Sequence, residues 1–169
     1  LYKCQMCGAC DVACKKDREL EPLEAMLAFR ARCVEDGHTL PALDRIIKGL
    51  EQTDNTMLRP RAGRGAWAEG LPVQDLRSEQ ADVAYHAGCR LSYDSEQWKI
   101  ARGTVEVLAR AGVTVGIAGD GEICCGGRPY EMGYQDKLAE HAERNRRLFE
   151  AAGVKTLLTS CAHCYHAFR

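Results

Sequence analysis

Five cysteines follow predicted β-strands in the second half of the chain, and their placement constrains the fold more than any other feature. Short strand patterns at 82–86, 113–117 and 155–160 alternate with amphipathic helix patterns at 95–112 and 134–153. Strands that alternate with helices of this length predict βαβ crossovers and a parallel sheet. We therefore expect an α/β fold, with a three-stranded parallel βαβαβ domain that a small helical segment precedes.

The cysteines of this half lie just beyond the strands. Cys89 follows the first strand, Cys124 and Cys125 follow the second, and Cys161 and Cys164 follow the third. The carboxyl ends of parallel strands meet at one edge of a sheet, where open α/β sheets bind ligands. We therefore expect five thiols in one crevice, which is more than a zinc ion needs and suits a cluster of several iron atoms.

The adjacent pair Cys124 and Cys125 is unusual, because one tetrahedral ion is normally bound by cysteines spaced two to four apart. Neighbouring thiolates suit either a vicinal disulfide or a site with several metal atoms. Two further alternatives concern Cys161 and Cys164, which could bind zinc with another pair or act as a thioredoxin-like dithiol.

The spacing of the five cysteines follows the pattern C-x34-CCG-x34-C-x2-C, in which positions 90–123 and 127–160 are the two long gaps. This pattern resembles the CCG domain found in the B-type and D-type polypeptides of heterodisulfide reductase, over about residues 82–164. The resemblance implies that the five cysteines hold a noncubane [4Fe-4S] cluster, whose neighbouring thiolates bind different irons. Gly126 and Gly127 would let the backbone approach the cluster.

The N-terminal stretch "CQMCGACDVAC" contains Cys4, Cys7, Cys10 and Cys14 in the C-x2-C-x2-C-x3-C spacing of bacterial ferredoxins. This run predicts a cubane [4Fe-4S] cluster, although Lys15 stands where a ferredoxin usually has proline. In two-cluster ferredoxins the fourth cysteine serves the other cluster. The fourth ligand is therefore expected upstream, or else from Cys14 or Cys33. Cys33 is otherwise expected to be a small apolar residue of a helix.

We expect three segments: a ferredoxin-type segment at 1–20, a helical linker at 21–80 and the CCG domain at 81–169. The first segment is expected to be incomplete and the chain to be part of a longer polypeptide, because no initiator Met precedes the first motif. The linker ends in a loop rich in Gly, Pro and Arg. We expect its arginines to be solvated, with docking of an acidic partner as the alternative; they are Arg59, Arg61 and Arg64.

Three histidines lie near the cysteines: His86, His163 and His166. We expect each to serve in local packing or hydrogen bonding. His163, between two thiolates, is the best candidate for a proton relay.

Composition excludes several function classes. The net charge of −1 argues against nucleic acid as a partner. No apolar run is long enough to cross a membrane, and no secretory signal is present. We therefore expect a cytoplasmic protein, either free or held peripherally at the cytoplasmic face of a membrane.

These features together predict an iron–sulfur electron-transfer subunit of an anaerobic oxidoreductase complex, with one cubane and one noncubane [4Fe-4S] cluster. The resemblance implies either a heterodisulfide-reductase-like catalytic subunit or a pure relay, serving a glycolate, lactate or glycerol-3-phosphate dehydrogenase or a bifurcating complex. A zinc or dithiol module is the remaining alternative. No flavin fingerprint is present, so flavin- or iron–sulfur-containing redox subunits are the expected partners, with a disulfide or a quinone-linked acceptor.

Overall fold

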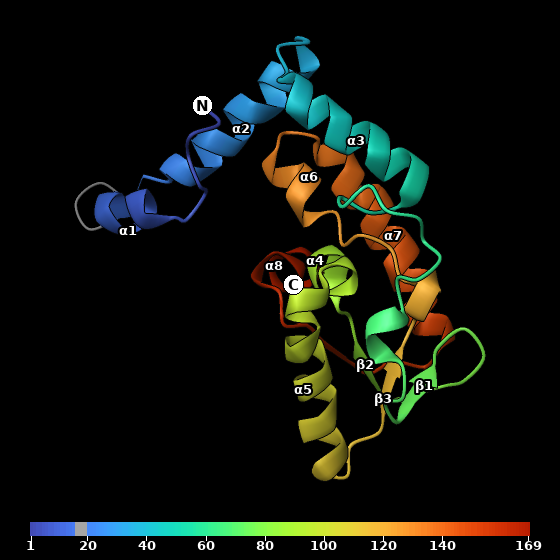
Figure 1. Ribbon diagram of the computed structural model, residues 1–169. Helices are drawn as coiled ribbons and strands as arrows, with labels where there is room; N and C mark the ends of the chain where they lie inside the picture. The colour runs from blue at the N-terminus through green and yellow to red at the C-terminus, as the bar shows by residue number, and fades with distance from the viewer. Residues whose placement is uncertain (16–19) are drawn as a thin grey trace.

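A computed structural model describes residues 1–15 and 20–169 of the chain. In this part of the chain, four strands form one parallel sheet in the order β1-β3-β2-β4 (Figure 1). The strands are β1 (Val73–Asp75), β2 (Val83–Tyr85), β3 (Val115–Ile117) and β4 (Thr156–Leu158). The predicted α/β class and parallel sheet are confirmed.

One strand is absent from the sequence prediction. β1 lies within the segment expected to be a helical linker and pairs with β3, Val73 opposite Val115. It is only three residues long and shows no alternation of buried and exposed side chains, so its sequence carries no strand pattern. The sheet therefore begins before the cysteine-rich half of the chain.

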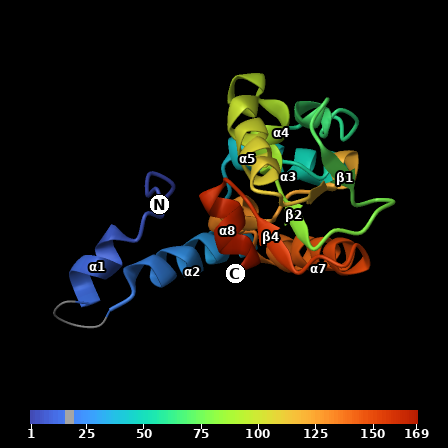
Figure 2. The ribbon, with the colours of Figure 1, turned by 90° about the horizontal axis from the view of Figure 1, so that it is seen from below.

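The helices that cover the sheet come from its crossovers. α5 (Trp98–Arg110) follows β2 and α7 (Gln135–Ala151) follows β3, and they lie on opposite faces of the sheet (Figures 1 and 2). The shorter helices at the strand ends are α4 (Gly88–Tyr93), α6 (Gly127–Glu131) and α8 (Ala162–Phe168), with 3-10 turns η1 (Ala66–Ala68), η2 (Ser95–Gln97) and η3 (Gly119–Gly121).

Each face of the sheet has its own apolar cluster. On the α5 face, Trp67 meets Tyr85 edge to face with ring centroids 5.6 Å apart, and Val105 packs in the same buried cluster. On the α7 face, Ala84 and Phe149 belong to a smaller cluster. Trp67 comes from the expected linker, so this segment contributes to the core.

The N-terminal elements extend away from the sheet as an arm formed by α1 (Ala9–Lys15) and α2 (Pro22–Glu35), and α3 (Pro41–Thr53) leads back over α6 and α7 (Figure 1). Arg30 of α2 is buried and donates hydrogen bonds to the carbonyl oxygens of Glu131 at 2.7 Å and Cys4 at 2.6 Å. This arginine therefore joins the first cysteine segment to α6. Residues 16–19 of the expected 1–20 segment lie outside the described residues.

No helix among the described residues is both long enough and apolar enough to cross a bilayer.

Candidate functional site

The order of the strands defines one crevice at the carboxyl edge of the sheet. From β2 the chain passes through α5 to β3 on one side, and from β3 through α7 to β4 on the other side of β2. The direction of winding thus reverses between β2 and β4. Ligands of open α/β sheets bind at such a reversal point, outside the carboxyl ends of the strands.

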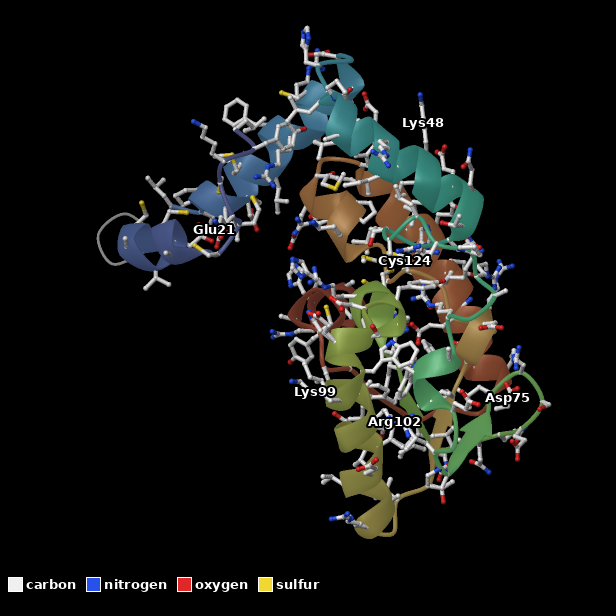
Figure 3. The ribbon with its side chains drawn as sticks, in the orientation of Figure 1. Glu21, Lys48, Asp75, Lys99, Arg102 and Cys124 are labelled. Atoms are coloured by element: carbon white, nitrogen blue, oxygen red, sulfur yellow. The ribbon has the colours of Figure 1, made fainter. Side chains whose placement is uncertain are left out.

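The five cysteines of the second half lie at this edge. Cys89 is in the first turn of α4 after β2, while Cys124 and Cys125 end the loop between η3 and α6. Cys161 is the N-cap residue of α8 after β4, and Cys164 lies on that helix. Figure 3 shows Cys124 between α6 and α4. The sequence predicts that these residues share an edge, and the strand ends bring them to it.

The five thiols form one continuous row. Each thiol lies close enough to its neighbour in the row to shift that neighbour's pKa, and the neighbours are Cys89 with Cys124, Cys124 with Cys125, Cys125 with Cys164, and Cys164 with Cys161. Cys124, Cys125 and Cys164 are buried, whereas the two ends of the row, Cys89 and Cys161, are half-buried. We call this set the five-cysteine row.

The thiols of the row differ in pKa. The neighbouring thiols Cys125 and Cys89 raise the pKa of Cys124. In the same way, Cys125 and Cys161 raise the pKa of Cys164. The pKa of Cys161 falls to about 5, first because Cys164 donates to it and then through the N–H groups of Cys164 and His163. Cys89 and Cys125 also have lowered pKa values, mainly from Cys124. Neighbouring thiols along the row therefore have pKa values shifted in opposite directions.

Two glycines allow the backbone to pass close to the row. Gly126 adopts φ +83°, and a Cβ there would lie 2.9 Å from Leu138 Cα. Gly127 has no room either, since a Cβ would lie 2.9 Å from the His163 carbonyl oxygen and 3.6 Å from Cys125 Sγ. The residues after the cysteine pair must therefore be small for α6 and α8 to close around the thiols.

The row does not have the geometry of a site for one ion. Among the described residues, no three His, Cys, Asp or Glu side chains surround a point where a single metal ion could bind. Five thiols that come together from three strand ends offer a set of soft donors, which matches the donor chemistry of iron–sulfur clusters. The residues present therefore fit an iron–sulfur cluster.

The backbone of Cys124 is held by residues that the sequence analysis does not single out. Its N–H donates to the Asp54 carbonyl oxygen at 2.8 Å. Its carbonyl oxygen accepts from Asn145 Nδ2 at 3.0 Å and lies 3.0 Å from His141 Nδ1. Both polar groups of this buried peptide are thus satisfied by α7 and by the end of α3.

Arg64 corrects one expectation. The sequence predicts that Arg59, Arg61 and Arg64 belong to a solvated loop; Arg59 and Arg61 are exposed, but Arg64 is only 1 % exposed. Its Nη2 lies 2.7 Å from Glu122 Oε1 in a buried ion pair. An arginine in a Gly- and Pro-rich stretch gives no sequence signal for burial, because its partner lies 58 positions further on.

The four N-terminal cysteines lie on the arm. Cys10 and Cys14 are one turn apart on α1, while Cys4 and Cys7 lie on the preceding loop, which turns at Met6 with φ 56° and Gly8 with φ 74°. Cys7 and Cys10 are exposed. The predicted further ligand, Cys33, is half-buried on α2.

A cavity of about 370 Å³ lies between the arm and α8. Cys7 lines it on one side, His163 and His166 on the other, and Tyr130 and Glu131 of α6 also face it. His163 Nε2 is 3.1 Å from Glu131 Oε2. The N-terminal cysteine run and the helix that carries Cys164 therefore border one cavity.

His86 is buried in the core, whereas His163 and His166 line the cavity. It is fully buried, with its ring edge to face with Phe168 at 4.9 Å between centroids and its Nδ1 3.5 Å from Glu122 Oε2. The structure thus gives His86 the packing environment that the sequence predicts.

The second half of the chain matches a known domain family. The model of the CCG cysteine-rich domain family matches residues 83–169. The chain belongs to this family. The resemblance inferred from the cysteine spacing is thereby confirmed, and the match covers all five members of the five-cysteine row.

Curated relatives of this CCG protein match nearly its whole length. The D-type polypeptide of dihydromethanophenazine:CoB–CoM heterodisulfide reductase from Methanosarcina barkeri is 27 % identical over 99 % of this chain and 40 % of its own length. The B-type polypeptide of fumarate reductase (CoM/CoB) from Methanothermobacter marburgensis is 29 % identical over 97 % of the chain and 31 % of its own length. EtfAB:quinone oxidoreductase from Syntrophomonas wolfei is 24 % identical over 100 % of the chain and 24 % of its own length.

The chain thus spans less than half the length of these relatives. No solved structure gives a significant match.

Proposed function

We propose that this chain is the iron–sulfur part of an oxidoreductase subunit and that it transfers single electrons between two clusters. The observation that carries the proposal is the convergence of five thiols from three strand ends into one row whose central members are buried. The relatives named as polypeptides of a heterodisulfide reductase, a fumarate reductase and a quinone oxidoreductase support this class of function.

In this proposal the five-cysteine row holds a noncubane [4Fe-4S] cluster; its members are Cys89, Cys124, Cys125, Cys161 and Cys164. A cluster there supplies one-electron redox chemistry. The protein's own residues exclude water from Cys124, Cys125 and Cys164, which are buried, and fix the adjacent pair through the Asp54 and Asn145 hydrogen bonds.

The N-terminal run is proposed to hold a cubane [4Fe-4S] cluster through Cys4, Cys7 and Cys10, with a fourth ligand from Cys14, Cys33 or a residue upstream. The cavity lined by Cys7 and His163 supports electron exchange between the two sites, because it places the N-terminal run beside the helix that carries Cys164. The expected domain boundaries and cytoplasmic location stay predictions.

A second function, disulfide reduction at the five-cysteine row itself, is favoured by one observation. Cys89 and Cys161, the ends of the row, are half-buried and not sealed inside the protein. In a pure relay, by contrast, the substrate would bind to a partner subunit that contains a flavin or further clusters.

Iron and acid-labile sulfide analysis of anaerobically purified protein tests the main proposal. We expect iron and sulfide in equal amounts and two distinct paramagnetic signals. Zinc without iron would refute the proposal and support the zinc or dithiol alternative. Disulfide turnover with a reduced dye then separates the two functions, since a pure relay leaves the disulfide unreduced.

A further inference from the structure

A buried charge lies against one end of the five-cysteine row. Both Nη1 and Nη2 of Arg64 are 3.8 Å from Cys89 Sγ, and its guanidinium carbon lies 5.7 Å from the centre of the Tyr93 ring. Arg64 and then Thr56 also contribute to the lowered pKa of Cys89, after the main contribution from Cys124. The sulfur of Cys89 thus faces the positively charged guanidinium and its N–H donors, which come from the loop that contains Arg64.

Glu122 fixes the position of this charge. Its Oε1 accepts from Arg64 Nη2 at 2.7 Å and Nε at 3.2 Å. The same carboxylate accepts the N–H groups of Gly88 at 3.0 Å and Ala87 at 3.1 Å, in the turn that leads into α4. The carboxylate therefore joins the arginine to the backbone that presents Cys89.

We propose that Arg64 is a positioning residue that raises the reduction potential of the group held by the five-cysteine row, acting through the sulfur of Cys89. This inference rests on the proposed function, because it requires a redox group at the row. It adds a residue that lies outside the 83–169 family match and that no cysteine pattern marks.

The physical reason is electrostatic. A fixed positive charge stabilises the state with one more electron, and hydrogen bonds to ligand sulfurs act in the same direction. The effect is large at this place because Arg64 and Glu122 are both almost fully excluded from water, so solvent screens the charge weakly. Glu122 partly cancels the charge of Arg64, but the guanidinium is the group in contact with Cys89.

Replacing the two members of the ion pair should therefore shift the midpoint potential in opposite directions. Redox titration of the full chain, followed by electron paramagnetic resonance of the signal from the row, should give a lower midpoint potential for Arg64→Gln. Glu122→Gln, which leaves the arginine charge uncompensated, should give a higher one. Arg64→Lys, which keeps the charge, should restore most of the potential.

Arg59→Gln is the matched control. It makes the same change of side chain on the same loop, but Arg59 is exposed, so the midpoint potential should stay unchanged. Circular dichroism and iron content of each variant establish that it folds and is loaded. If Arg64→Gln does not fold, the rise in Glu122→Gln and the value in Arg64→Lys still decide.

The inference is overturned if the row is loaded but its midpoint potential does not change in these variants. It is also overturned if the midpoint potential shifts in the same direction in Arg64→Gln and Glu122→Gln. Either result leaves the proposed function intact. A protein that binds no cluster at the row in any form, the unmodified chain included, overturns both. A purely structural role of Arg64 would lower loading in both variants without shifts of opposite sign.

Discussion

The carbonyl oxygen of Asp54 accepts a hydrogen bond from the N–H of Cys124 at 2.8 Å. Asp54 lies at the end of α3 in the left-handed conformation with φ 56°, and its carboxylate pairs with Arg61 at 3.0 Å and Arg144 at 2.6 Å. This one residue therefore joins the loop before the sheet, the adjacent cysteines and α7.

Asp54→Ala should lower the free energy of unfolding by about 1–2 kcal/mol, since it loses two partly exposed ion pairs and leaves alanine with a positive φ. Asp54→Asn should cost less than about 1 kcal/mol, because asparagine tolerates that conformation and only the charge is lost. Urea denaturation of the two variants checks the difference. Equal losses would mean that backbone strain at this position does not matter.

Replacing Gly126 by alanine should abolish loading of the five-cysteine row. The new Cβ would lie 2.9 Å from Leu138 Cα, so α7 would have to move away from the cysteine pair. Gly112→Ala is the control: Gly112 has a similar φ of +76° but nothing within 4 Å of its Cβ. That change should cost only about 1–2 kcal/mol from the backbone conformation. Iron content of the purified variants distinguishes crowding from strain, and normal loading of Gly126→Ala would count against the close approach that we describe.

Cys125→Ser should remove the paramagnetic signal of the five-cysteine row and leave the signal of the N-terminal run. The two sites draw on separate segments, the arm and the strand ends, so loss of one ligand should not reach the other. The unmodified chain should contain about eight iron atoms if both [4Fe-4S] clusters are present. Loss of both signals in a folded variant would contradict this separation.

Cys33→Ala should keep both signals, because Cys33 is one residue of a helix on the arm and the fourth ligand can come from elsewhere. Electron paramagnetic resonance of the reduced variant is the measurement. Disappearance of the signal from the N-terminal run alone would instead identify Cys33 as its fourth ligand.

Iron loading of the metal-free protein should improve as the pH rises. Metal ligands must be thiolates, yet thiol hydrogen bonding raises the pKa of Cys124 and Cys164, so both still carry protons at neutral pH. Binding must then release these protons, and raising the pH favours that release. Reconstitution with ferrous iron and sulfide at several values between about pH 6.5 and 8.5 measures the effect. A yield that is constant or falls over this range would be the opposite result.

The position of the site in the sheet can be predicted from the sequence, but the residues that surround the five cysteines cannot. Strand and helix patterns from residue 82 onward give the order of β2, β3 and β4 along the chain, and the carboxyl-edge rule then brings Cys89 to Cys124 and Cys161. This inference needs only local periodicity and the geometry of parallel sheets.

β1 and the Arg64–Glu122 ion pair could not be predicted, because both exist only through contacts far apart in the sequence. The Val73–Asp75 segment is a strand because β3 offers it an open edge, not because of its own pattern. Arg64 is buried because Glu122 neutralises it, and a charged residue in a loop is normally solvated.

The loop from Asp54 to Arg64 limits how this site can be moved between proteins. The cysteine pattern alone starts at Cys89, but the Cys124 N–H donates to the carbonyl oxygen of Asp54, and the charge beside Cys89 comes from Arg64. A gene fusion or a chimera that exchanges only the recognisable cysteine-rich stretch would leave these groups behind. The smallest transplantable unit therefore starts at the end of α3, and breakpoints between related proteins should be rare from Asp54 to Cys164.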